Sequence, residues 1–494
     1  MLFRHWRPPG RVSAMETPRS TGPWAALWSM MVGFFVILVD STIVAVAIPA
    51  ISTAFDATYS QIIWVNSSYL LAYAVPLLIT GRLGDRIGPR TVYLCGLSLF
   101  TVASLACGLA TSIEALILAR AVQGFGGALV TPQTMSVMLR TFAPQQRGGA
   151  MGVWGATAGV ATIVGPLLGG LLVDAWGWAW IFIINVPVGI VGIALAWVFV
   201  PRLEQNARTF DWVGVALSAS GMFCLVFGIQ EGQTFSWSFA IVALICAGAV
   251  LLSLFVWWQA KTTRDPLVPL ELFSDRNFSL ACVAISTVGF AISTYVIPWM
   301  IYVQNVQHYS PTQAALLLLP AGLISGCFSP WVGKLTNTHQ PKPFAIAGLS
   351  LVAVAIGAAA FITDPSVSPM WLLVVSVING FGNSMVWGPL SMIATRNLDP
   401  RLAGAGSSVY NTVRQLGAVI GSAGIAAMMS QQLTRQLGPA AADFSGGGSA
   451  QALPDVLHQP FAQAMSTSML LPLSVVIVGV LVSTRFVRTQ SWND

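Results

Sequence analysis

The chain has 494 residues, of which only 8% are charged and 55% are hydrophobic. Soluble domains carry about 25% charged residues, so this composition excludes a water-soluble enzyme, a disordered regulator and a disulfide-rich secreted scaffold. It predicts an all-α polytopic membrane protein. At about 20 residues per transmembrane helix, the length allows well over ten crossings.

Fourteen long apolar runs, bounded by charged or turn-forming residues, follow one another along the chain. Each is long enough to cross a hydrocarbon layer about 30 Å thick. Because fourteen is even, both termini are expected on the same side. The predicted spans cover 24–50, 60–80, 91–111, 113–138, 148–173, 179–200, 212–231, 236–258, 277–302, 312–335, 343–363, 369–395, 403–430 and 465–486.

The basic residues predict the orientation. With an inside N-terminus, 20 of the 23 lysines and arginines fall in inner segments, and one, Arg435, falls in an outer loop. Such an excess marks the cytoplasmic side, so both termini are expected in the cytoplasm. The other two, Arg120 and Arg414, lie inside apolar spans. Arginine outnumbers lysine 20 to 3, which favours a bacterial source and therefore a bacterial plasma membrane.

The chain repeats itself. A Gly-rich basic loop at 81–90 has a weaker copy at 333–342, and the Pro-basic-Gly segment 144–149 has a copy at 400–404. Duplicated halves are typical of transporter folds. The predicted organisation is an inner tail 1–23, a six-span bundle 24–200, two linker spans within 212–258, an inner loop 259–276, a second six-span bundle 277–486 with a flexible outer loop 431–464, and an inner tail 487–494.

Two ionisable residues lie deep in spans of the first half, Asp40 and Arg120. A charge at the centre of a membrane helix costs about 2.5–3.5 kcal/mol, so such residues usually face a cavity or a partner. Gln123 shares the helix face of Arg120 by its i+3 spacing. Two interpretations stay open. One is a structural ion pair. The other is a site where Asp40 carries a proton or faces a cationic substrate, and where the fixed charge of Arg120 lowers the pKa of its partner until substrate arrives.

A polar stripe in the second half consists of Asn411, Arg414 and Gln415. Their i+3 and i+4 spacing places them on one helix face. Lipid would not tolerate this face, so we expect it to line a cavity used by substrate or protons.

The segment GRLGDRIGPR (81–90) is expected to join spans 2 and 3 on the inner side. Its glycines permit a tight turn, and Asp85 could accept hydrogen bonds at a helix N-terminus or pair with Arg90. The alternative is a solvated turn that only adds positive charge. The candidate inner-gate residues are Gly81, Asp85, Arg86, Gly88 and Arg90.

The span 148–173 is unusually rich in glycine, with several pairs four residues apart. This spacing lets helix backbones approach closely, and a proline inside the span removes a backbone donor. Tight packing and a pliable hinge are both compatible with it. The candidate hinge residues are Gly152, Gly165, Pro166, Gly169 and Gly170.

Together these segments resemble the fourteen-span drug:proton antiporters of the major facilitator superfamily. The resemblance covers essentially the whole chain. GRLGDRIGPR is similar to the superfamily's signature loop, the segment that begins at Arg120 to its proton-coupling motif, and the glycines around Pro166 to its antiporter motif. Asn337 stands in the second loop where an acid would fit the pattern.

The resemblance implies proton-driven export of amphipathic, often cationic drugs by alternating access, and hence a role in antibiotic resistance. Asp40 would bind protons or substrate, Arg120 would couple them, and Asp85 with Arg90 would form the inner gate. Export of an endogenous metabolite, lipid or siderophore remains open, as does uptake by a proton symporter, which the antiporter motif disfavours.

The expected partners are protons, an amphipathic small molecule and membrane lipid. The sequence has no GxxxxGK[ST] motif, its four histidines are scattered and its six cysteines lie in apolar stretches. We therefore expect neither an enzyme, a cofactor, a metal, a nucleotide nor a nucleic acid, with the proton gradient as energy source. A monomer is also expected.

Overall fold

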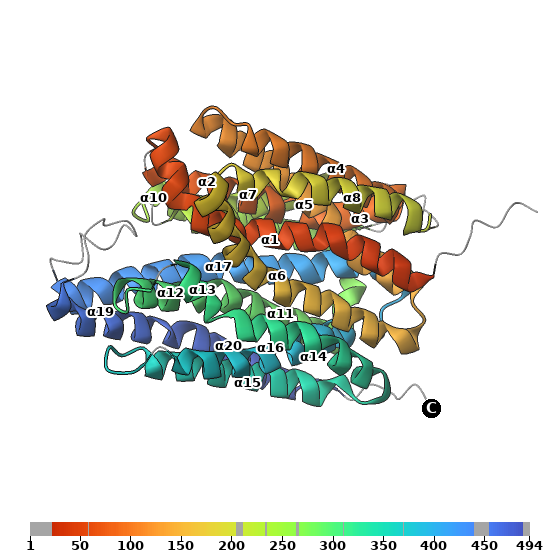
Figure 1. Ribbon diagram of the computed structural model, residues 1–494. Coiled ribbons are helices and arrows are strands. Elements are labelled where there is room, and N and C mark those ends of the chain that lie inside the picture. Colours follow the sequence, from red (N-terminus) through yellow and green to blue (C-terminus); the bar gives the residue numbers. More distant parts are fainter. Residues whose placement is uncertain are drawn as a thin grey trace, which may run out of the picture.

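The computed structural model describes residues 22–487 except 58, 204–210, 233–234, 263–265, 310, 369 and 439–453. Over this part it forms helices and no strands (Figure 1). Thirteen helices there are long and apolar enough to cross a membrane. The predicted tails 1–23 and 487–494 lie almost wholly outside the described residues.

The first bundle consists of helices that follow one another with short connections. They are α1 (Pro23–Phe55), α2 (Tyr59–Ala74), α3 (Leu77–Ile87), α4 (Pro89–Gly108), α5 (Ile113–Thr141), η1 (Pro144–Gln146), α6 (Arg147–Trp176), α7 (Trp180–Ile183) and α8 (Asn185–Phe199).

Two linker helices and the second bundle follow. They are α9 (Trp212–Glu231), α10 (Phe239–Lys261), η2 (Leu270–Ser274), α11 (Arg276–Thr294), α12 (Val296–Asn305), α13 (Pro311–Leu316), α14 (Leu319–Thr338), α15 (Pro341–Ile362), α16 (Trp371–Thr395), η3 (Pro400–Leu402), α17 (Ala403–Leu437), α19 (Asp455–Ser468) and α20 (Leu470–Thr484).

The predicted second span, 60–80, differs from a single helix. A break at Pro76 divides it into α2 and α3, because proline has no N–H to continue the hydrogen-bond ladder. Helix α3 then runs on to Ile87, so most of the predicted loop 81–90 is helical and only Gly88 turns the chain. Gly88 has φ 92°, which requires glycine. The count of fourteen crossings stays a prediction.

The predicted outer loop 431–464 is wrong at both ends. Helix α17 continues to Leu437 and α19 begins at Asp455, so helix replaces the expected flexible chain there. Residues 439–453 in its middle lie outside the described part. Part of the predicted inner loop 259–276 packs against the protein, since Leu267, Val268 and Leu272 are buried.

Close helix packing through glycine holds the bundles together. In the first bundle a Cβ on Gly126 of α5 would lie 2.7 Å from the Phe100 nitrogen of α4. Between the bundles, a Cβ on Gly152 of α6 would lie 2.5 Å from the Ser329 oxygen of α14. Without side chains the backbones approach until dispersion contacts are made along the whole crossing.

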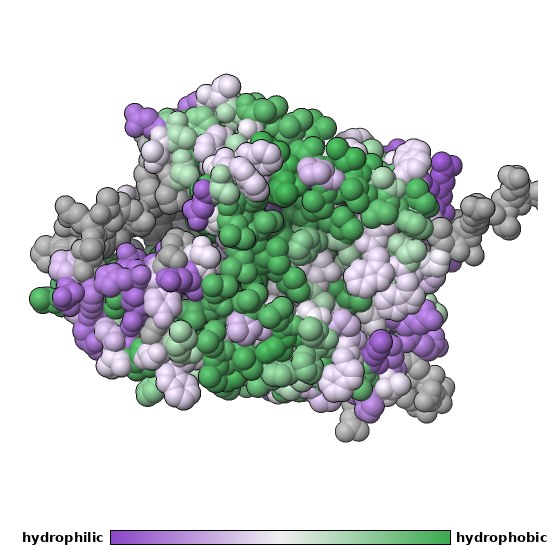
Figure 2. Space-filling model, in the orientation of Figure 1, coloured by the Kyte–Doolittle hydropathy of each residue, from purple (hydrophilic) through white to green (hydrophobic). Residues whose placement is uncertain are grey.

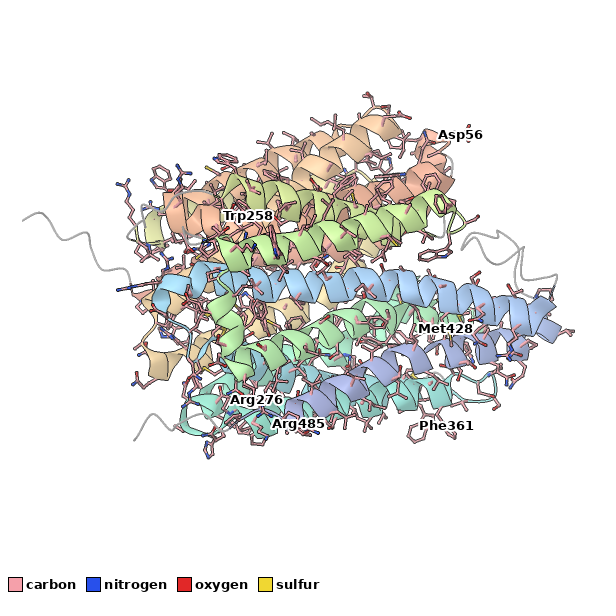
Figure 3. The ribbon with its side chains drawn as sticks, turned by 180° about the vertical axis from the view of Figure 1, so that it is seen from behind. Asp56, Trp258, Arg276, Phe361, Met428 and Arg485 are labelled. Carbon is pink, nitrogen blue, oxygen red and sulfur yellow. The ribbon has the colours of Figure 1, made fainter. Side chains whose placement is uncertain are left out.

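The surface agrees with a membrane-spanning bundle. Figure 2 shows a belt of hydrophobic residues between two ends where hydrophilic residues gather. In Figure 3 Arg276 and Arg485, predicted to be inner, lie at one end, and Asp56 and Phe361, predicted to be outer, lie at the other. Phe361 is 89% exposed, as lipid contact would allow.

Candidate functional site

Asp40 and Arg120 form an ion pair inside the first bundle. Asp40 lies in the middle of α1 and Arg120 in the second turn of α5, and their Oδ2 and Nη1 atoms are 2.6 Å apart. Both side chains are fully buried. Burying two charges costs several kcal/mol each, and the pair can recover this only if their remaining polar atoms are also hydrogen-bonded.

Amide side chains supply these additional hydrogen bonds. Gln123 Nε2 and Asn185 Nδ2 donate to Asp40 Oδ1 at 2.9 and 2.8 Å. Gln123 Oε1 accepts from Arg120 Nη1 at 2.6 Å. Ser104 Oγ accepts from both amides, at 2.6 and 3.3 Å. The carboxylate therefore has a donor on each oxygen, and the cluster joins α1, α4, α5 and α8.

The remaining side of Arg120 faces α2 and an aromatic ring. Its Nε donates to the Val65 carbonyl at 3.2 Å, and the guanidinium carbon lies 4.1 Å from the centre of the Tyr69 ring. Arg120 Nη2 has no hydrogen-bond partner among the described residues. Cation–π attraction on a desolvated ring contributes about 2 kcal/mol. Arg120 is thus held in place by several partners even apart from Asp40.

The sequence predicted three members of this cluster, Asp40, Arg120 and Gln123, and missed Ser104 and Asn185. Asn185 carries a faint signal, since it is a lone amide within the apolar run IFIINVPVG. Ser104 carries none, because serine is common in membrane helices. The structure shows the ion pair that the sequence left open as an interpretation, and the roles of its residues in transport stay predictions.

Arg414 lies elsewhere, on α17 of the second bundle. It is partly buried, and it forms no ion pair or hydrogen bond with any described residue. Asn411 and Gln415 are buried beside it on the same face. This face is turned toward the first bundle, because Ser407, one turn before Asn411, donates to the Pro132 carbonyl of α5 at 3.3 Å. The start of the predicted polar stripe therefore lies at the contact between the two halves, whereas the Arg414 stem lies near Gly289 of α11 in its own bundle.

Asp85 of α3 lies at the end of the molecule predicted to be inner. Its carboxylate pairs with Arg140 in the last turn of α5. It also lies against Gly404 in the first turn of α17, where a Cβ would overlap it. The positive end of the α17 dipole favours a carboxylate there. One acid thus joins α3 and α5 of the first bundle to α17 of the second.

The predicted pairing of Asp85 with Arg90 is wrong. Gly88 turns the chain between them, and Arg90 donates instead to the Trp197 carbonyl of α8, with its guanidinium 5.4 Å from the Trp197 ring centre. The partner of Asp85 is Arg140, which the sequence analysis did not predict. Arg140 was counted there only among the basic residues of the predicted inner segments. Of the other loop residues, Arg86 is exposed, and Gly81 packs on α17, where a Cβ would lie 2.5 Å from Ser408 Cβ.

The hinge residues are placed in tight contacts. Gly165 and Gly169 face α1, where a Cβ on Gly169 would lie 2.8 Å from Ile43 Cγ1. Gly170 is looser, with 3.3 Å to Thr312 Oγ1. Pro166 lies inside α6, which continues to Trp176. Tight packing is therefore observed, and hinge motion stays a prediction.

A small cavity in the second bundle lies where the duplication would place a counterpart of the charged cluster. It has a volume of about 10 Å³, room for roughly one water, and is lined by α11, α15, α16 and α20. Its polar groups are neutral: Asn379 Nδ2 donates to Tyr295 Oη at 2.7 Å, and Asn383 Nδ2 donates to Asn379 Oδ1 at 3.2 Å. The second bundle thus lacks an ion pair at this place.

Comparison with known families decides the assignment. The Major Facilitator Superfamily model matches residues 30–212 and 209–422. The chain belongs to this superfamily. As a member whose described residues include thirteen helices able to cross a membrane, it is a multi-pass membrane protein.

Individual relatives of this superfamily cover most of the chain. An uncharacterised MFS-type transporter of Mycobacterium tuberculosis is 48% identical over 93% of this chain and 80% of its own length. The multidrug resistance protein Stp of the same species is 33% identical over 82% of this chain and 76% of its own. Among solved structures, the proton:xylose symporter XylE superposes with a TM-score of 0.60 at 13% identity, covering 93% of this chain and 95% of XylE, which shows a shared fold.

Proposed function

We propose that this member of the major facilitator superfamily exports amphipathic drugs in exchange for protons by alternating access. The observation that carries the proposal is the fully buried Asp40–Arg120 pair, an acid whose charge a single proton can cancel. The relatives support the direction of transport, since Stp is named a multidrug resistance protein.

The contacts of α1 suggest how a proton would act. Protonation of Asp40 removes the counter-charge of Arg120, and the cluster must rearrange because an arginine stays charged. Thr42 and Ile43, two and three residues after Asp40 in α1, pack on Gly165 and Gly169 of α6. Helix α6 in turn packs on α14 of the second bundle through Gly152. A shift at Asp40 therefore has a contiguous path to the contact between the halves.

The contacts of Asp40 do not favour direct binding of a cationic drug to its carboxylate. A cationic drug was expected because a lone carboxylate would attract it, yet Arg120, Gln123 and Asn185 already occupy this carboxylate. A cation would have to displace Arg120, so Asp40 serves better as the proton site than as the drug site. The amphipathic character of the substrate remains part of the proposal.

The test is dye uptake into inverted membrane vesicles under an imposed proton gradient, with rhodamine 123 as the probe. Asp40→Asn is expected to abolish the dependence of uptake on the gradient. Asp174→Asn is the matched control, because Asp174 is an exposed acid on α6 and the chemical change is the same. Gradient-dependent uptake by Asp40→Asn at the wild-type level would exclude Asp40 as the coupling acid.

We further propose that the protein works as a monomer in a bacterial plasma membrane with both termini in the cytoplasm. Protons, the drug and surrounding lipid are its partners, the proton gradient drives it, and it needs neither cofactor nor nucleotide. The positive charge of the predicted inner segments supports the orientation. Accessibility of single cysteines introduced at Arg485 and Asp56 to an impermeant reagent tests it.

A further inference from the structure

Arg414 is an arginine inside a membrane span without a counter-charge. The other such arginine, Arg120, is neutralised by Asp40, so these three residues carry a net charge of one positive unit. A guanidinium cannot lose its proton in a protein, so this positive charge persists in every state. Charges in membrane spans pair with a partner or face a cavity, and among the described residues Arg414 has no partner.

The groups around Arg414 are also unsatisfied. Arg414 Nε and Asn411 Oδ1 are both buried without a hydrogen-bond partner. Asn411 uses its Nδ2 to donate to the Ser407 carbonyl at 2.9 Å, which leaves its oxygen facing outward from the helix. The Gln415 side chain makes no hydrogen bond with a described residue. Buried polar groups are rarely left unpaired, so two neighbouring ones suggest a missing ligand.

The backbone is built to bring Arg414 close to α11. A Cβ on Gly289 would overlap the Arg414 carbonyl oxygen and would lie 3.3 Å from its Cγ. Glycine at 289 therefore lets the Arg414 stem lie against α11. Arg414 as a residue keeps some exposure although its Nε is buried, whereas the Arg120 side chain has none.

We propose that Arg414, with Gln415 and Asn411 beside it, binds an anionic group, a carboxylate or a sulfonate, on the exported amphipathic molecule. A guanidinium binds such oxygens through two parallel hydrogen bonds, and Gln415 adds a further donor. Asn411 Oδ1 accepts from a hydroxyl or N–H next to the anionic group. The proposal rests on the proposed export function, and it assigns to this chain substrates that carry a negative charge.

The experiment measures binding by fluorescence anisotropy to the purified full chain in nanodiscs, without a proton gradient. Fluorescein, which carries a carboxylate, and rhodamine 123, a cation, share one xanthene scaffold. Arg414→Gln is expected to weaken fluorescein binding at least tenfold and to leave rhodamine 123 within twofold. Arg414→Lys, which keeps the charge, should bind fluorescein better than Arg414→Gln.

The matched control is Arg435→Gln, because Arg435 is exposed in the last turn of the same helix and loses the same charge. It should bind fluorescein within twofold of wild type. An equal loss of both dyes in Arg414→Gln would show a structural role and overturn the proposal. So would wild type that fails to bind fluorescein, or an Arg414→Gln variant that binds it normally.

The two proposals fail separately in this design. If Arg414→Gln weakens fluorescein binding but inverted vesicles show no proton-driven uptake of rhodamine 123, the anion site is supported and the export function is refuted. If inverted vesicles take up rhodamine 123 under the proton gradient while Arg414→Gln has no effect on fluorescein binding, the export function is supported and the anion site is refuted.

Discussion

The Asp40–Arg120 pair makes a prediction that a double-mutant cycle can measure. Asp40→Asn keeps an oxygen for the Gln123 and Asn185 donors but leaves the fully buried Arg120 without its counter-charge. Removing one partner of a buried ion pair costs about 3–5 kcal/mol of unfolding free energy. We expect Asp40→Asn to lie in this range, because Arg120 cannot be neutralised.

Arg120→Gln should cost less. Asp40 would keep two amide donors at 2.8 and 2.9 Å, and the loss comprises the charge-assisted hydrogen bond, the hydrogen bond to the Val65 carbonyl and the contact on Tyr69. Hydrogen bonds to charged groups contribute about 1.5–3 kcal/mol, so we expect about 2 kcal/mol. The double variant buries no charge in this cluster. It should therefore be more stable than the two single costs predict, by about 2–3 kcal/mol.

The assay is unfolding in mixed micelles by added SDS, followed by tryptophan fluorescence, for the wild type and the three variants. Asp174→Asn again controls for the loss of an acid at an exposed position. If the double variant matches the sum of the two single variants within about 0.5 kcal/mol, the two residues are not energetically coupled. The ion pair would then be unable to serve as the link between protonation and helix packing.

Three further changes test other contacts. Gly404→Ala puts a methyl group against the Asp85 carboxylate and should loosen the inner end by about 1–3 kcal/mol, seen as faster hydrogen exchange there. Gly165→Ala crowds α1 and should lower dye transport without preventing insertion. Hydrogen bonds from Ser366 lower the pKa of Asp364, so the stabilisation by its carboxylate should be complete above about pH 4 and be lost as the pH falls further, and Asp364→Asn should remove this pH dependence of the melting temperature.

Hydrophobic length predicted most of the helices, because it is a local property of the chain, and the orientation inferred from the basic residues stays a prediction. Thirteen of the predicted spans coincide with helices able to cross a membrane. The exception is the predicted span 60–80. Its hydropathy is continuous, but a break at Pro76 divides it into α2 and α3. Likewise the outer loop looked flexible by composition, but its ends extend neighbouring helices.

The candidate site was predicted only where a residue was anomalous by itself. Asp40 and Arg120 stand out because a charge in a membrane span is costly. Asn185 lies 145 residues from Asp40 in the chain, and only the packing of α8 against α1 brings them together. Arg140 was not predicted as a site residue, because a basic residue at a cytoplasmic helix end is common. Its pairing with Asp85 depends on how α3 and α5 pack.

At the predicted inner end, the two halves of the chain make corresponding contacts that differ in charge. The Asp85 carboxylate of the first half lies at the start of α17, and Asn337, its counterpart on α14, accepts a hydrogen bond from the Gly148 N–H at the start of α6 at 2.9 Å. Each half thus places a polar side chain at the N-terminus of a helix in the other half, and Asn337 satisfies a free N–H group there. The first contact carries a charge and the second does not.

This asymmetry predicts the effect of changing Asn337. Asn337→Asp adds a negative charge at the positive end of the α6 dipole and should stabilise the closed inner end by about 0.3–1 kcal/mol. Asn337→Leu removes the hydrogen bond to Gly148 and should weaken it by about 1 kcal/mol. Hydrogen exchange of the amides at 148–152 should therefore be slowest for Asp, intermediate for Asn and fastest for Leu. Faster exchange in Asn337→Asp than in wild type would contradict a dipole contribution, and the amide would then be the better partner for this helix end.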